Sequence, residues 1–83
     1  MITVRYFAAA AEAAGVDTEQ LSAGSAAQVR AAMVAAHGPA LDRVLGRCAL
    51  LADGTRVEGD DLVAAGATLD VLQPDRPMSA IGG

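Results

Sequence analysis

Apolar and polar side chains alternate near both ends of the chain. Residues 2–7 begin with three apolar positions separated by polar ones, and residues 68–73 open with the same alternation. A period of two is the pattern of a strand that buries one face. Phe7 and Leu72 break the alternation, because each is apolar where the pattern asks for a polar residue. We therefore expect a strand in each segment, with Phe7 and Leu72 on the face away from the core.

The main helix is predicted to begin at Ser25. Ser25 and Gln28 have the spacing of a capping box, in which each side chain accepts a hydrogen bond from the other residue's backbone N–H. Gly38 and Pro39 end the helix. One apolar stripe at helical spacing is expected to face the core: Val29, Ala32, Met33 and Ala36.

Asp53 and Gly54 lie between two short runs at 48–52 and 55–57. An Asp-Gly pair favours the tight turn that needs positive φ at both central residues, so a β-hairpin is predicted here. The remaining segments carry weaker signals: a short helix at 8–14 that ends at Gly15, a strand at 18–21, one further helical turn at 41–45 and a single turn at 60–65.

The order of these elements predicts an α+β fold, with a long helix covering one face of a mixed sheet. In one such arrangement the first and last strands lie side by side and parallel at the centre. Phe7 and Leu72 then sit at the same end of neighbouring strands, where an exposed apolar pair is a reasonable docking patch. Arg5 and Asp70 are expected to pair across the same two strands.

The character of the sequence changes after residue 73. Pro74 and Pro77 do not continue a central strand, and the residues that follow them show no period. We therefore divide the chain of 83 residues into one folded domain, residues 1–73, and a flexible tail, residues 74–83.

Charge and composition limit the classes of partner. The net charge is −4, and the six cationic residues are arginines scattered along the sequence. A nucleic-acid-binding protein needs a basic face with stacking aromatic residues, and neither is visible, so no nucleic-acid partner is expected. An acidic chain favours partners with basic docking surfaces.

The cytoplasm is the expected location. The single cysteine, Cys48, excludes an internal disulfide and fits a reducing compartment. The sequence lacks the pattern of a signal peptide. No apolar stretch reaches the roughly 18 residues of a transmembrane helix, so no membrane association is expected.

Candidate catalytic or metal-binding residues are few. His37 lies in the last turn of the main helix, where a positive charge suits the helix dipole. Cys48 lies in an apolar run and is interpreted as a small core residue. Glu58, Asp60 and Asp61 are interpreted as the charges of a solvated turn. Cys48 has no second cysteine or histidine near it in sequence, so no metal site is predicted.

The last two residues suggest the most specific chemistry in the sequence. A partner enzyme that activates the terminal carboxylate must thread it through a narrow channel to ATP. Glycine permits that approach because it has no Cβ, so Gly82 is the expected neck and Gly83 the reacting residue. The carboxylate attacks the α-phosphate of ATP to give an acyl-adenylate, and sulfur then displaces AMP to leave a thiocarboxylate. From residue 75 the extended tail spans at most about 30 Å, enough to enter a pocket.

Several segments together resemble one family of small proteins: the start at 4–8, the segment 12–15, the Asp53-Gly54 hairpin, the strand at 66–72 and the diglycine end. Over nearly its whole length the sequence is similar to the MoaD/ThiS family of sulfur carriers. It resembles most the MoaD branch, the small subunit of molybdopterin synthase. The resemblance implies a ubiquitin-like β-grasp fold, with a mixed five-stranded sheet, one main helix on one face and a flexible C-terminal tail.

The resemblance also implies a role in molybdopterin (molybdenum cofactor) biosynthesis. An E1-like adenylyltransferase of the MoeB type would adenylate Gly83 with ATP, and the thiocarboxylate would donate sulfur to a pterin precursor in a large MoaE-type subunit. The chain would be a protein co-substrate rather than an enzyme, with no bound cofactor. Gly82 and Ile81 would bind in the partner's channel, while Phe7 and Leu72 would contact the partner's surface.

Other functions stay open at this point. The family usually has a shorter tail, so a carrier for thiamine or cysteine biosynthesis is an alternative. A ubiquitin-like protein modifier joined to targets through Gly83 is a second class, although the chain contains no lysine and does not build lysine-linked chains on itself. A plain interaction domain that uses only Phe7 and Leu72 is the third.

Overall fold

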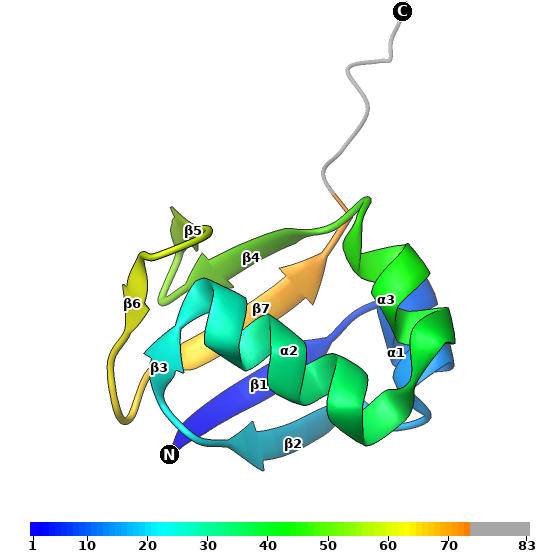
Figure 1. Cartoon of the computed structure of the whole chain (residues 1–83), viewed down its shortest axis with the longest axis horizontal. Coiled ribbons are helices and arrows are strands. Elements are labelled where there is room, and N and C mark those ends of the chain that lie inside the picture. The colour runs from blue at the N-terminus through cyan, green and yellow to red at the C-terminus, as the bar shows by residue number, and fades with distance from the viewer. Residues whose placement is uncertain (74–83) are drawn as a thin grey trace, which may run out of the picture.

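Residues 1–73 are the part of the chain that the computed structural model describes, and they form a sheet with α2 lying across one of its faces (Figure 1). The predicted tail, residues 74–83, lies outside the described residues. The elements follow one another in this order: β1 (Ile2–Tyr6), α1 (Ala9–Ala14), β2 (Thr18–Leu21), β3 (Gly24–Ser25), α2 (Ala26–His37), α3 (Pro39–Leu45), β4 (Ala49–Ala52), β5 (Thr55–Val57), β6 (Leu62–Val63) and β7 (Thr68–Leu72).

The first and last strands lie side by side at the centre of the sheet. Its strand order is β2-β1-β7-β4-β5, and β1 and β7 are the parallel pair. Their register runs from Thr3 opposite Thr68 to Tyr6 opposite Val71. β2 pairs antiparallel with β1, and β4 pairs antiparallel with β7. The predicted mixed five-stranded sheet with parallel first and last strands is therefore confirmed.

The hydrophobic core lies between α2 and the sheet. It takes the alternate residues of the central strands, as the period of two predicts, together with one stripe of α2. The buried apolar side chains are Ile2, Val4, Tyr6, Ala10, Ala26, Val29, Met33, Leu41, Leu45, Val57, Val63, Ala67, Leu69 and Val71.

The predicted stripe of α2 is right in its middle and wrong at its end. Val29 and Met33 are buried and Ala32 is half-buried, but Ala36 is exposed. The next helix, α3, follows directly after α2 and contributes the fully buried Leu41 to the core. The further helical turn predicted at 41–45 is thus a helix of seven residues that begins earlier, at Pro39.

The capping box of α2 forms as predicted. The Ser25 hydroxyl oxygen accepts a hydrogen bond from the Gln28 backbone N–H at 3.1 Å, and the Gln28 side-chain oxygen accepts one from the Ser25 N–H at 3.0 Å. Gly38, with φ of +88°, ends the helix. The hairpin turn between β4 and β5 is also confirmed, because Asp53 and Gly54 have φ of +49° and +88°.

Residues 60–65 were predicted as a single turn, and this prediction is incomplete. They contain β6, which pairs antiparallel with β3 in a second, two-stranded sheet. The backbone N–H of Ala26 donates to Asp61 O at 2.8 Å, and that of Ala27 donates to Gly59 O at 2.9 Å. These bonds satisfy two of the donors that the start of a helix leaves unpaired, so the 59–61 loop holds the beginning of α2 in place.

A polar cluster connects β1, β2 and α2 at one edge of the core. The Tyr6 hydroxyl donates a hydrogen bond to the Glu19 carboxylate, and His37 Nε2 lies 2.6 Å from the same carboxylate oxygen. The Tyr6 and His37 rings meet edge to face with their centroids 5.8 Å apart. Sequence reasoning placed His37 correctly in the last turn of α2 but did not find Glu19 as its partner.

No helix within residues 1–73 is long and apolar enough to cross a lipid bilayer.

The Tyr6 contacts predict an alkaline limit to stability. Burial raises the pKa of Tyr6, and the hydrogen bond and charge of Glu19 raise it further. The unfolded chain releases this proton near the ordinary tyrosine pKa of about 10, whereas the folded protein keeps it. The contribution of Tyr6 to stability is therefore complete below about pH 10 and falls as the pH rises above that value.

Tyr6 is the single tyrosine of the chain, so tyrosinate absorbance reports on this residue alone. We expect that absorbance to rise together with the loss of helical circular dichroism during an alkaline titration. Tyr6→Phe, the control, contains no tyrosine, so no tyrosinate forms and its helical circular dichroism should persist to higher pH than that of the natural chain. A tyrosinate signal near pH 10 in protein that remains folded would contradict the assignment.

Candidate functional site

The face of the sheet away from α2 carries a compact group of apolar side chains. Tyr6 and Val71 are buried on the helix side, so their neighbours Phe7 and Leu72 point to the opposite face. Residues directly opposite in a sheet project to the same side, so Ala49, which pairs with Leu72, also lies on this face. We call Phe7, Leu72, Ala49 and Leu51 the outer-face patch.

The outer-face patch is accessible. Phe7 is 42% exposed, and the other three members are half-buried. The backbone N–H of Phe7 donates to Val71 O at 3.1 Å, which continues the β1–β7 ladder by one residue and fixes Phe7 beside Leu72. The predicted placement of Phe7 and Leu72, at the same end of neighbouring strands and on the uncovered face, is confirmed. Their predicted role in binding stays a prediction.

An ion pair lies beside the apolar residues of this face. Arg5 Nε is 2.6 Å from Asp70 Oδ1, and Arg5 Nη2 is 2.9 Å from Asp70 Oδ2. The predicted cross-strand pair is therefore present, and it has the two-donor geometry that favours arginine. The Arg5 guanidinium carbon also lies 5.5 Å from the centre of the Phe7 ring, within cation–π range. Asp70 thus holds Arg5, and Arg5 covers part of the Phe7 ring.

The outer-face patch lies at the point where the described chain ends. β7 finishes at Leu72, and Gln73 is the last described residue (Figure 1). Ten residues of the sequence follow Gln73, and a segment of ten residues spans at most about 35 Å when fully extended. The predicted reacting residue Gly83 and its neighbours Gly82 and Ile81 lie outside the described residues.

Cys48 has the structural role that the sequence predicts. It is half-buried and packs against the core, and burial raises the pKa of its thiol. A raised pKa keeps the thiol protonated at neutral pH, which makes it a poor nucleophile.

The acidic turn after β5 is a solvated turn, as the sequence predicts. Glu58, Asp60 and Asp61 are exposed, and the Glu58 N–H donates to Asp61 Oδ2 at 3.0 Å. Within residues 1–73 no three His, Cys, Asp or Glu side chains lie close enough together to hold a metal ion.

Sequence reasoning missed two members of the outer-face patch. Residues 48–52 are a continuous apolar run, so no alternation marks which of them face the core. Such a run is itself informative, because a strand that is apolar on both sides places an apolar surface on each face of the sheet. Here Leu50 packs against the core, while Ala49 and Leu51 lie on the outer face.

The described residues define a ubiquitin-like β-grasp protein with an apolar patch on the open face of its sheet. No protein-family model matches the sequence, and no curated protein matches it either. Solved structures with the same fold do match. Two are crystal structures of SAMP1, the small archaeal modifier protein 1, from Haloferax volcanii, and one is a Pyrococcus furiosus protein designated molybdopterin converting factor, subunit 1.

The agreement with these structures extends over almost the whole chain. The two SAMP1 structures are 24% and 25% identical to it, cover 90% and 89% of this chain and 96% and 97% of their own, and both give a TM-score of 0.77. The Pyrococcus furiosus protein is 20% identical, covers 89% of this chain and 97% of its own, and gives 0.71. These structures confirm the predicted β-grasp fold. They also include a molybdopterin converting factor subunit, in line with the resemblance of the sequence to the MoaD/ThiS family.

The Arg5–Asp70 pair is expected to contribute little to stability by itself. Its side chains are 48% and 22% exposed, and exposed pairs typically contribute about 0.2–1 kcal/mol. A double-mutant cycle with Arg5→Gln and Asp70→Asn, measured by urea unfolding, should give a coupling energy in this range. The coupling should shrink in high salt. A coupling above about 2 kcal/mol would show that the pair is a main determinant of the fold.

Proposed function

We propose that this protein is a sulfur carrier whose Gly83 carboxylate is adenylated and then converted to a thiocarboxylate, for use in molybdopterin biosynthesis. One observation carries the proposal. The chain ends in two glycines, ten residues beyond an accessible apolar patch on a β-grasp domain. The P. furiosus structure that shares this fold is designated molybdopterin converting factor, subunit 1, which supports the choice of pathway.

The chemistry takes place in two steps on an E1-like adenylyltransferase, for which we propose the MoeB type. First, the Gly83 carboxylate oxygen attacks the α-phosphate of ATP, and pyrophosphate leaves. The product is a mixed anhydride between the carboxylate and AMP. Hydrosulfide then attacks the acyl carbon, the bond to AMP breaks, AMP leaves, and the terminal group becomes a thiocarboxylate. ATP is bound by the partner, and this chain supplies only the acid group.

The geometry of residues 1–73 suits this division of tasks. A partner that binds the outer-face patch holds the domain at the place where the last ten residues begin. Those residues reach at most about 35 Å, so a nucleotide site inside the partner is within reach while the domain stays outside. Gly82, which has no Cβ, fits a narrow channel next to the reacting group.

The chain that carries the thiocarboxylate then needs a second partner, which accepts the sulfur. We propose a large subunit of the MoaE type, in which the thiocarboxylate gives its sulfur to a pterin precursor. The small protein acts as a co-substrate rather than as a catalyst. The protonated thiol of Cys48 is consistent with this role, because the chain offers no activated nucleophile there. The lone cysteine is also consistent with a location in the cytoplasm.

Attachment to other proteins is the second candidate function. Two of the structures that share the fold are of a protein called a small archaeal modifier, which favours this alternative. A modifier forms an isopeptide bond between its terminal carboxyl group and a lysine of the target. Because this chain contains no lysine, its conjugates would carry single copies rather than lysine-linked chains. Intact mass spectrometry of cellular protein separates the two outcomes, since one gives a thiocarboxylate and the other a larger conjugate.

Deleting Gly83 is expected to abolish activation. The protein should be incubated with ATP, sulfide and a MoeB-type enzyme, and its intact mass measured for the replacement of one oxygen by sulfur. We expect this change in the full chain and not in the deletion variant. Ser79→Ala, a change in the same terminal segment that keeps the diglycine, serves as the control. Full activation of the deletion variant would refute the proposal.

The same deletion should leave folding unchanged, because it removes no side chain and shortens the terminal segment by one residue. Thermal unfolding of the two proteins, followed by circular dichroism, is the measurement. A clear drop in unfolding temperature would show that the end of the chain is part of the fold, which would contradict a role as a reachable acid group.

Phe7→Asp is expected to weaken docking on the activating enzyme by about tenfold or more, because it places a charge in the centre of the apolar contact. Its effect on the free energy of unfolding should stay within about 1 kcal/mol, since Phe7 is outside the core. Leu62→Asp is the matched control, because Leu62 is 79% exposed and lies on β6, in the other sheet. Equal loss of binding in both variants would contradict docking through the outer-face patch.

A further inference from the structure

Two arginines flank the end of β7. Arg43 lies in the last turn of α3 and Arg47 two residues after that helix, so the two are four positions apart in sequence. Both side chains are exposed. Together with Ala9, Val44 and Gln73 they line a shallow hollow of about 150 Å³. Since Gln73 is the last described residue, these root arginines stand where the terminal segment begins.

Arg43, Arg47 and Arg56 make no ion pair within residues 1–73, but only Arg43 and Arg47 lie together around one hollow. Arg5 pairs with Asp70, and Arg30 pairs with Asp42 at 3.1 Å. Neither Arg43 nor Arg47 makes an ion pair or a side-chain hydrogen bond with any described residue. Two guanidinium groups are thus available to a partner at one place on the surface.

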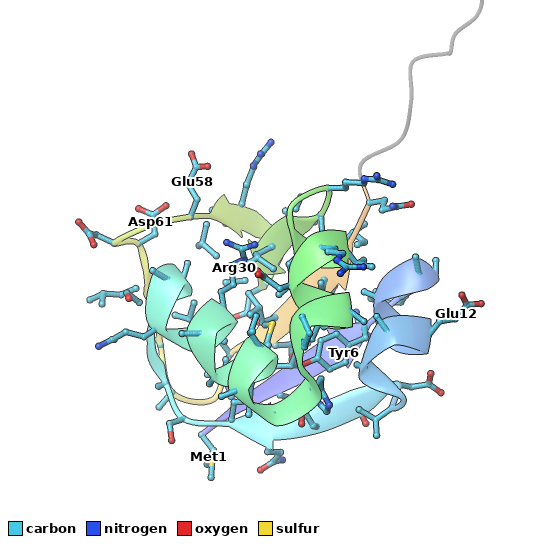
Figure 2. The ribbon with its side chains drawn as sticks, turned by 45° about the vertical axis from the view of Figure 1, so that its right-hand side comes forward. Met1, Tyr6, Glu12, Arg30, Glu58 and Asp61 are labelled. Carbon is cyan, nitrogen blue, oxygen red and sulfur yellow. The ribbon has the colours of Figure 1, made fainter. Side chains whose placement is uncertain are left out.

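Their charge is opposite to that of the protein as a whole. The net charge of the chain is −4, and the acidic turn with Glu58 and Asp61 follows β5, which is separated from β7 by β4 (Figure 2). The fold places these two arginines, which are already near one another in sequence, beside the end of β7. The sequence analysis expects partners with basic docking surfaces because the net charge of the whole chain is negative. That expectation does not apply to the surface around Arg43 and Arg47.

We propose that Arg43 and Arg47 bind carboxylates on the protein that takes in the terminal segment. This inference rests on the proposed function. Arginine pairs well with carboxylates because its planar group offers two parallel donors. Complementary charge at the rim of an interface raises the association rate and excludes wrong partners. The hollow is also lined by Ala9, two residues after Phe7, and by Gln73, one residue after Leu72, so the chain leads from the outer-face patch to the root arginines within two residues on either strand.

A protein partner fits these residues better than a nucleic acid does. Nucleic-acid binding depends on a broad basic surface that tracks phosphates, with aromatic side chains for stacking. Two arginines on a chain of net charge −4 do not provide that surface, and one of the two aromatic residues, Tyr6, is buried. A short row of carboxylates on a protein is the complementary group.

The test measures activation of the full chain by a MoeB-type enzyme as a function of carrier concentration and salt. Arg43→Glu and Arg47→Glu are each expected to raise KM about tenfold with little change in kcat, because rim charges act on encounter rather than on chemistry. The KM of the natural chain should rise with sodium chloride, and that of the variants should rise less. Circular dichroism confirms that each variant folds.

The double variant Ala31→Glu/Ala35→Glu is the matched control. It changes the net charge by the same amount, both side chains are exposed, and both lie on α2, on the other face of the sheet from the outer-face patch. We expect its KM to stay within about twofold of that of the natural chain. An equal rise in KM for all three variants would show a general charge effect and overturn the proposal, as would unchanged KM values for the root variants. Failure of the natural chain to be activated at all would instead remove the proposed function, and this inference with it.

Pairing with the chain's own Asp75 is the remaining alternative. Repeating the Arg47→Glu measurement with Asp75→Asn present separates it from docking on the partner. The proposal expects the rise in KM to persist in this background. Loss of the effect would show that Arg47 acts on its own chain, which would overturn the proposal.

Discussion

The parallel pairing of β1 and β7 is the interaction on which the rest of this structure depends. It joins two segments whose paired residues Arg5 and Asp70 are 65 positions apart in sequence. Parallel strands end at the same edge of a sheet, so this one ladder brings the residue after β1 next to the root of the terminal segment. The core side chains of both strands keep the ladder in place, because they are buried under α2.

Under the proposed function, this arrangement separates recognition from chemistry. The proposed recognition surface, the outer-face patch, belongs to a packed domain, in which the hydrogen bond from Phe7 N–H to Val71 O and the ion pair of Arg5 fix the positions of the exposed groups. The proposed reacting residue, Gly83, lies ten residues beyond Gln73 in the sequence. A small domain has little room for an enclosed site. Under the proposed function the domain still takes part in group transfer, because the partner would provide the site and the nucleotide.

Local patterns in the sequence predict most of the fold, and contacts between distant segments account for the rest. The Ser25 capping box and the Asp53-Gly54 turn are decided within a few residues, so both could be predicted. β3 and β6 have two residues each and exist only because they pair with one another, so neither carries a periodic signal. The exposure of Ala36 depends on how α2 packs in the whole fold, which the apolar stripe alone does not show. The spacing of Arg43 and Arg47 is visible in the sequence, but their position beside the end of β7 is not.

The ion pair beside the outer-face patch restricts which surfaces can cover this face. Covering Arg5 and Asp70 removes two charges from water, and burial of a charge is unfavourable unless polar groups replace the lost hydration. A purely apolar partner surface would contact Phe7 and Leu72 favourably but would remove both charges from water without replacing their hydration. A partner surface with a matching hydrogen-bond donor and acceptor would keep the favourable free energy of the apolar contact. The Arg5–Asp70 pair therefore disfavours non-specific association with apolar surfaces, to which an exposed hydrophobic sheet face is otherwise prone.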